Sequence, residues 1–167
     1  HFIRVSSRTG VLWCPSFYVD VPYRDIIKNF GALLIPAFAM VRTQEIIYHL
    51  NSLVESGYIS LIPVLIDSLM ANRITEIYRK YTICYDDETV EQIESGDKPL
   101  DFRGLHNVKS RDESRSVTQF RPPFIIIAGS GMCNSGRINF YMLQGKWTLG
   151  RNLAEGSKKV PMLKTIA

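Results

Sequence analysis

A glycine-rich loop follows one of the most apolar runs in the chain. The run covers residues 124–128, and the loop after it reads GSGMCNSGR, with glycines at 129, 131 and 136 and an arginine at 137. Glycine lets the backbone turn through positive φ and approach a ligand closely, so several amides can face one anion. A guanidinium can bind the same anion through two parallel hydrogen bonds. The loop therefore indicates a phosphate site, and the alternative is a strand-to-helix turn whose glycines serve geometry alone.

Two earlier segments show the same order of apolar strand, polar loop and amphipathic helix. Residues 32–35 precede a helix that begins near Arg42, and residues 61–66 precede Asp67, Ser68 and a helix over residues 71–81. A helix start offers unpaired N–H groups and the positive end of the helix dipole to an anion. Asp67 and Ser68 could instead cap the second helix, a role that these residue types often fill.

These units predict an α/β fold with a mainly parallel sheet flanked by helices. Shorter helices are expected over residues 86–95 and 111–119, the second with a capping box from Ser110 and Glu113. Ligands of such sheets bind at the carboxyl ends of the strands. That edge is expected to gather Arg42, Asp67, Ser68, Ser130 and Arg137.

Four other large side chains are expected in the core rather than as platforms for bases: Met70, Tyr78, Tyr81 and Met132.

Composition allows one sizeable core and excludes a disordered chain. The sequence has 167 residues, of which 46% are hydrophobic, and a net charge of +4 that mildly favours anionic partners. Its three cysteines are far apart, which argues against a disulfide framework or a thiolate zinc site and favours the cytoplasm. The apolar runs are too short for a membrane span. A chain that starts at His1 also suggests missing upstream sequence.

Four stretches in order resemble the β-CASP ribonucleases of the metallo-β-lactamase superfamily, and their bacterial and archaeal branch most closely. The stretches are GALLIPAFAMVRTQEIIYHL, IPVLIDSLMANRITEIYRKY, FIIIAGSGMCNSGRI and TLGRNLAEGSKKV. The resemblance implies a zinc-dependent phosphodiesterase that acts on RNA. In that family a metallo-β-lactamase domain carries two zinc ions, and the inserted β-CASP domain closes over it to hold the nucleic acid.

The resemblance also implies roles for single residues. Asp67 would be a catalytic-site residue that orients the domain interface or a zinc-bound water network, unless it caps a helix. The contacts to phosphate and to the RNA backbone would come from Arg42, Ser68, Gly129, Ser130, Gly131, Met132 and Arg137. Contacts of this kind position RNA without reading its sequence.

The chain departs from the family pattern at several places. The zinc-binding H-x-H-x-D-H segment is absent, and the histidines are only His1, His49 and His106, so no metal ligands are assigned in this chain. The remaining departures are Pro15 for the glutamate of E-S-T-Y-G, Val41 for the glycine of A-V-G-R, Leu69 for the proline of D-S-P-M-A, and Phe140-Tyr141 for His-His.

The resulting prediction has three segments. Residues 1–22 are read as a remnant of the metallo-β-lactamase αββα domain, 23–143 as the β-CASP domain, and 144–167 as the start of the C-terminal metallo-β-lactamase segment. The chain would be the RNA-clamping part of a zinc ribonuclease, binding single-stranded RNA and cleaving nothing alone, with a homodimer possible.

Two alternatives stay open. One is a non-catalytic RNA-binding or assembly module, which the lost glutamate and histidines favour. The other is a nucleotide-binding α/β enzyme, in which an acidic residue near the end of the second strand contacts a ribose.

Overall fold

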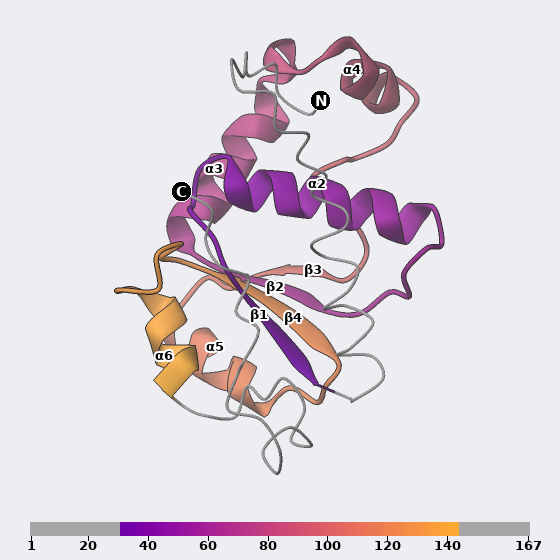
Figure 1. The fold of residues 1–167 in the computed structure, drawn as a ribbon. Helices are drawn as coiled ribbons and strands as arrows, with labels where there is room; N and C mark the ends of the chain where they lie inside the picture. The colour runs from indigo at the N-terminus through magenta and orange to yellow at the C-terminus, as the bar shows by residue number, and fades with distance from the viewer. Residues whose placement is uncertain (1–30, 144–167) are drawn as a thin grey trace, which may run out of the picture.

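The computed structural model describes residues 31–143, and within them four parallel strands form one sheet with helices on both faces. The strands are β1 (Ala32–Pro36), β2 (Val64–Asp67), β3 (Leu105–Asn107) and β4 (Phe124–Ala128), paired in the order β1-β4-β2-β3. Figure 1 shows α2 (Arg42–Glu55) and α3 (Leu69–Lys80) on one side of the sheet and α5 (Arg111–Ser116) and α6 (Arg137–Leu143) on the other. The predicted α/β class is confirmed.

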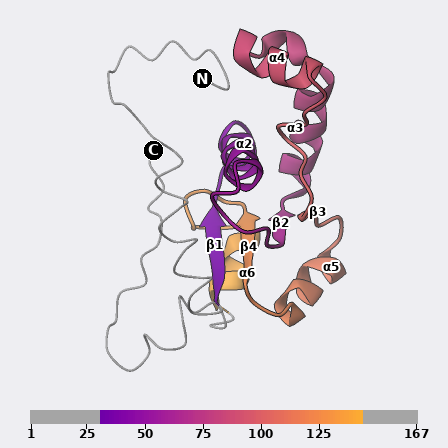
Figure 2. The ribbon, with the colours of Figure 1, turned by 90° about the vertical axis from the view of Figure 1, so that its right-hand side faces the viewer.

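Alternate side chains of β4 enter two separate cores. Ile125 and Ile127 pack in the cluster under α2 and α3, which also contains Ile47 and Leu50. Phe124, Ile126 and Ala128 point to the opposite cluster, with Ile138 and Tyr141 of α6. All five residues of β4 are buried, because a strand covered on both faces has no polar side. Figure 2 shows β4 between β1 and β2, the central place that this apolar run requires.

Helices α3, α4 and α5 each begin at a side chain that caps them. Ser68 accepts a hydrogen bond from the amide of Ala71 at the start of α3, and Asp86 does the same for Thr89 at the start of α4 (Asp87–Glu94). Ser110 accepts from the amide of Glu113, as its capping spacing predicted. Each such cap satisfies one N–H that has no partner within its helix. Two short 3₁₀ turns complete this part of the chain: η1 (Thr82–Cys84) and η2 (Val117–Gln119).

The structure also corrects the sequence interpretation. β3 was not predicted, because Leu105, His106 and Asn107 show no apolar alternation; it forms by pairing with β2. Residues 61–63, expected in a strand, lie outside β2.

Three residues expected in the core are exposed. Met70 is 66% exposed, Met132 60% and Tyr81 54%, whereas Tyr78 packs partly against the core. Met70 lies in the first turn of α3 and Met132 in the loop after β4, both at the carboxyl ends of strands. The remnants expected at residues 1–22 and 144–167, and the fourth motif at 148–160, lie outside the described residues. Within residues 31–143, no helix combines the length and apolarity that a membrane crossing needs.

Val41 adopts a strained backbone conformation just before α2. Its φ is 68° and its ψ −62°, and the amide of Arg42 donates to the carbonyl of Met40 across it at 2.9 Å. This is a γ-turn of the hand that is rare and strained for an L-residue, and a β-branched side chain suits it poorly. The family resemblance places glycine at this position, and glycine would avoid the steric part of the cost.

Val41→Gly should therefore stabilise the chain, by about 1 kcal/mol, because relief of strain exceeds the entropy that glycine adds to the unfolded state. Urea unfolding measures this free energy. The matched control is Val54→Gly near the end of α2, which relieves no positive φ and should destabilise by about 1 kcal/mol or more. If both variants lose stability alike, Val41 is not strained.

Candidate functional site

Three strand ends meet at one edge of the sheet. Pro36 of β1 and Asp67 of β2 both lie beside Ala128 of β4 in the strand register. The loops that follow these strands are therefore neighbours, as the sequence analysis predicted from the parallel order. This strand-end edge brings together the starts of α2, α3 and α6 with the glycine loop, residues 129–136.

Asp67 is the buried centre of the edge. None of its surface is exposed, and it carries an ion pair with Nη1 of Arg137. Its other oxygen accepts hydrogen bonds from Ser114 Oγ at 2.5 Å and from the Tyr141 hydroxyl at 2.6 Å. A buried carboxylate needs such a cation and such donors, because desolvation would otherwise be prohibitive. Helix capping, one of the two roles predicted for Asp67, is wrong, since Ser68 is the cap.

The partners of Asp67 come from two helices on the same face of the sheet. Arg137 and Tyr141 stand one turn apart on α6, and Ser114 lies on α5. Residues four apart share one side of a helix, so both α6 side chains can reach the end of β2. Nη1 of Arg137 also donates to the carbonyl of Ser110 at 3.4 Å. The network therefore fastens α5 and α6 to the strand-end edge.

Tyr141 is held in its protonated form. Burial raises the pKa of its hydroxyl well above the ordinary value, and the hydrogen bond to Asp67 raises it further. A phenolate beside a buried carboxylate would lose its donor role and add a like charge. The hydroxyl thus acts as a fixed hydrogen-bond donor.

The glycine loop is closed by its own backbone. The amide of Ser130 donates to the carbonyl of Ser135, and the amide of Ile138 donates to the carbonyl of Gly129 at 2.7 Å. Gly136 has a φ of +78°, and a Cβ there would stand 2.8 Å from the Gly129 oxygen. Geometry therefore requires this glycine. The Ser130 amide, one of those predicted to face an anion, is instead used within the loop.

The glycine loop also packs on the loop after β1. A Cβ on Gly131 would lie 2.8 Å from the ring of Phe38, so only glycine allows this contact. The loop after β1 is in turn held by Thr43, whose hydroxyl donates to the carbonyl of Phe38 at 2.8 Å. Gln44 is fully buried and donates to Ala39 and to Thr75. The two loops form one locked unit at the edge.

The predicted phosphate-binding side chains stand in different settings. Arg42 begins α2 and pairs with Glu45 at 2.9 Å, with 37% of its side chain exposed. Arg137 has 23% of its side chain exposed beside Asp67. The Ser130 hydroxyl donates to Asn134 at 2.9 Å, and Ser68 serves as a helix cap. The edge thus gathers both arginines, each with a carboxylate partner.

Sequence reasoning missed four residues that hold this edge: Thr43, Gln44, Ser114 and Tyr141. Thr43 and Gln44 lie in the R-T-Q-E run that carried part of the family resemblance, so that signal was available. Tyr141 was noted only as a departure from the His-His of the family, and Ser114 gave no signal, because each meets Asp67 across a long stretch of chain.

The described residues do not fit the zinc site that the resemblance implies. Protein zinc sites use three or four histidine, cysteine or carboxylate ligands. Within residues 31–143, no three such side chains gather. His49 lies on α2 and His106 on β3. We assign no chemical step in this part of the chain to a metal.

Comparison with known proteins gives consistent matches. A family model described as the Beta-Casp domain matches residues 43–150. Ribonuclease TTHA0252 of Thermus thermophilus is 30% identical over 135 residues, 74% of this chain and 31% of that protein. An RNase J-like protein of Methanocaldococcus jannaschii is 28% identical over 154 residues, 84% of this chain and 35% of its own length.

Transcription termination factor FttA of Methanosarcina mazei is 26% identical over 161 residues, 87% of this chain and 25% of that protein. The chain thus spans between a quarter and about a third of the length of these relatives.

The pair of Asp67 and Arg137 should matter to stability far more than the pair of Arg42 and Glu45. Arg137→Met leaves a buried carboxylate without its cation and should lower the free energy of unfolding by about 3 kcal/mol. Asp67→Asn added to it removes both charges but keeps an acceptor for Ser114 and Tyr141, so most of the loss should return. Urea unfolding of the single and double variants measures this coupling.

Arg42→Met serves as the control at the same edge. It removes an arginine from a partly exposed pair and should cost less than about 1 kcal/mol. Equal losses for Arg42→Met and Arg137→Met would show that burial of Asp67 is not what makes Arg137 important.

Alkaline pH should reveal the raised pKa of Tyr141. The unfolded chain loses this phenolic proton near pH 10, as a free tyrosine does, whereas the folded chain keeps it above that pH. The folded state therefore binds more protons, and this contribution, complete below about pH 10, is lost as the pH rises further.

Tyr141→Phe should be less stable than the parent at pH 8, because Asp67 loses a donor. The difference should narrow above about pH 10. Unfolding free energies measured from pH 8 to 11 test this, and a gap that stays constant over that range would contradict it.

Proposed function

Since the chain belongs to the Beta-Casp domain family, we propose that it is the RNA-holding part of an RNA-processing ribonuclease. The observation that carries the proposal is the meeting of Arg42, Arg137 and the glycine loop at one edge of a parallel sheet. Two guanidinium groups at helix starts suit phosphates, which they would position without reading bases. Single-stranded RNA is the partner that such backbone contacts favour.

We propose for Asp67 a positioning role in this site. Its carboxylate fixes the guanidinium of Arg137, and it has no exposed surface with which to touch RNA. The same burial argues against a nucleotide-binding enzyme, because an acidic residue that recognises a ribose must reach its hydroxyl groups. Asp67 therefore contributes by holding Arg137 and α6 in place.

Hydrolysis would need the zinc-binding domain that the resemblance implies, and residues 31–143 do not supply its ligands. In the proposed arrangement this part holds RNA, and a metallo-β-lactamase domain elsewhere in the complete protein cuts it. A reducing cytoplasm suits the scattered cysteines, and a homodimer stays a prediction of the sequence analysis.

RNA affinity should depend on Arg42 in the manner of a phosphate contact. Arg42→Gln should weaken binding of labelled oligouridine and oligoadenine to a similar extent. It should also make the slope of log affinity against log salt concentration about 0.7 less steep, as expected for the loss of one phosphate contact on a single strand. Fluorescence anisotropy at several salt concentrations measures both quantities.

Glu45→Gln is the matched control, because it removes the partner of Arg42 and leaves the guanidinium in place. It should keep the salt slope of the parent. An unchanged slope in Arg42→Gln would remove Arg42 from the interface. Arg137→Ala is a poorer test, because it also leaves Asp67 buried without its cation.

Zinc content and RNA cleavage, measured on the complete reading frame, separate the ribonuclease from a non-catalytic RNA-binding module. A ribonuclease should hold about two zinc ions and cut the RNA. RNA binding without zinc or cleavage would favour the module.

A further inference from the structure

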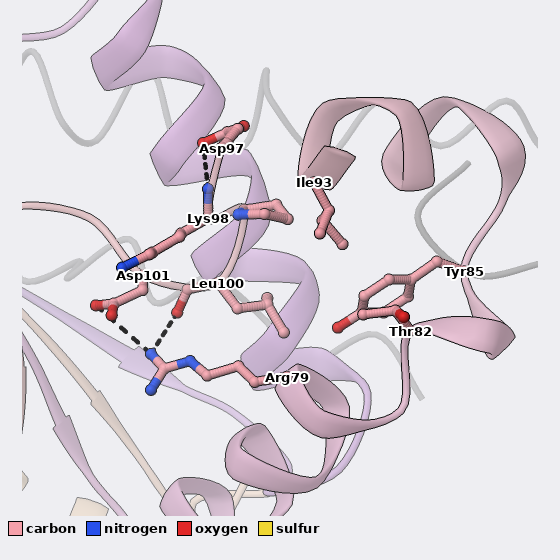
Figure 3. A pocket seen from close by; sticks show the side chains of 9 residues that line it. Arg79, Thr82, Tyr85, Ile93, Asp97, Lys98, Leu100 and Asp101 are labelled. Carbon is pink, nitrogen blue, oxygen red and sulfur yellow. Dashed lines mark hydrogen bonds and ion pairs between the residues drawn. The ribbon is translucent and has the colours of Figure 1, made fainter. Parts of the chain in front are cut away.

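A cavity of about 310 Å³, whose lining residues Figure 3 shows, includes Arg79 in the last turn of α3. It therefore lies at the end of α3 opposite to the strand-end edge. It opens between the last turn of α3, η1, α4 and residues 97–101. Because an α-helix rises about 1.5 Å per residue, the first and last residues of α3, Leu69 and Lys80, are roughly 16 Å apart along its axis, and so are edge and cavity. The site proposed for RNA therefore does not include this cavity.

Apolar groups dominate the cavity wall. Ile93 and Leu100 project into it, facing the ring of Tyr85, as Figure 3 shows. The Tyr85 hydroxyl donates to the carbonyl of Tyr78 at 2.9 Å, which fixes that ring. Two cations line the wall, Arg79 and Lys98. Arg79 donates to the carbonyl of Leu100 at 2.6 Å and lies 3.6 Å from Asp101. Asp97 and Asp101 line the same wall and offset the two positive charges, so the cavity suits an apolar side chain.

Two exposed apolar side chains lie next to a cavity-lining residue in the chain. Ile83 on η1 is 90% exposed, and Tyr81 just before it is 54% exposed. Both flank Thr82, which lines the cavity. Adjacent exposed apolar groups beside a cavity are typical of a surface that binds another protein.

The surroundings of the cavity are strongly acidic in an otherwise basic chain. Residues 86–101 contain seven aspartates and glutamates and one lysine, whereas the whole chain carries a net charge of +4. The exposed members of this group are Asp87, Glu88, Glu91, Glu94 and Asp101. Such a field repels the phosphates of RNA and attracts lysine and arginine.

Glu55 adds to this field from the end of α2. Burial raises the pKa of its carboxyl, and a hydrogen bond to Asp97 and repulsion from it raise the pKa further. Asp97 itself lines the cavity. Carboxyl groups this close favour a cationic neighbour, which would relieve their repulsion.

We propose that this cavity docks a basic peptide segment of a partner protein. One large apolar side chain of the peptide fills the space between Ile93, Leu100 and Tyr85, as an anchor residue does in a protein interface. Its lysines and arginines lie against the carboxylates of residues 86–101. The site joins the chain to another protein and leaves the strand-end edge open.

Fluorescence anisotropy with the labelled peptide RKLRKLRKLR tests the proposal. The comparison peptide RKSRKSRKSR keeps every charge and lacks the apolar anchors. The leucine peptide should bind the chain about tenfold more tightly than the serine peptide. Thr82→Trp, which fills the cavity, and Ile93→Ser, which removes an apolar wall, should each abolish that preference.

Charge variants test the acidic surroundings. Glu91→Gln with Glu94→Gln should weaken the leucine peptide about threefold at low salt and less at high salt. Glu76→Gln with Asp112→Asn changes net charge equally at exposed positions outside residues 86–101 and should alter affinity less than about twofold. Thermal unfolding confirms that each variant is folded. If Thr82→Trp does not fold, the preference measured for Ile93→Ser tests the proposal.

Four outcomes would overturn the proposal. The first is equal affinity for the two peptides, and the second is an unchanged preference for the leucine peptide in a folded cavity variant. The third is displacement of the leucine peptide by oligouridine. The fourth is a rise in the unfolding temperature with MgCl₂ or CaCl₂ that Asp97→Asn removes. The third would indicate a nucleic-acid site and the fourth a metal site. Because oligouridine binding at the strand-end edge is measured separately with Arg42→Gln, failure here leaves the proposed function untouched.

Discussion

A carboxylate without exposed surface, at the end of a central strand, needs a cation and hydrogen-bond donors at fixed positions. Asp67 imposes this requirement, and Arg137, Ser114 and Tyr141 meet it from two helices. Because the helix that supplies Arg137 begins directly after the glycine loop, the ion pair also fixes where that loop ends. The stability of α5 and α6 and the shape of the strand-end edge therefore depend on one buried charge.

The glycine loop and the loop after β1 lock together by close approach. Gly131 admits the ring of Phe38, and Gly136 admits the carbonyl of Gly129. Val41 shows the opposite case, since a β-branched residue occupies a turn that glycine would fit with less strain. Strain of this kind persists only where the surroundings hold it, and here the hydrogen bonds of Thr43 and Gln44 hold the adjoining loop.

Local pattern was enough to predict the elements that position the edge. The apolar run of β4 and the capping spacing of Ser110 and Glu113 carry their structure in neighbouring residues. β3 was not predicted, because the extended conformation of its three residues depends on pairing with β2. The contacts of Ser114 and Tyr141 with Asp67 were not predicted, because these residues lie 47 and 74 positions from Asp67 in the sequence. No local pattern encodes contacts over such separations. The resemblance aligned Tyr141 with a histidine, and the structure gives its hydroxyl a donor role that an imidazole could also fill.

The surroundings of α3 differ in charge between its two ends. At its start lie the arginines of the strand-end edge, whereas its last turn, which carries Arg79 and Lys80, is followed by the acidic stretch of residues 86–101. An approaching polyanion is attracted to the first region and repelled by the second. The mild net charge of the chain therefore hides an uneven distribution of positive and negative charge over its surface. A basic peptide experiences the reverse preference. With about 16 Å of helix between them, more than the Debye length of about 8 Å at physiological salt, the regions can each hold a ligand with little interference.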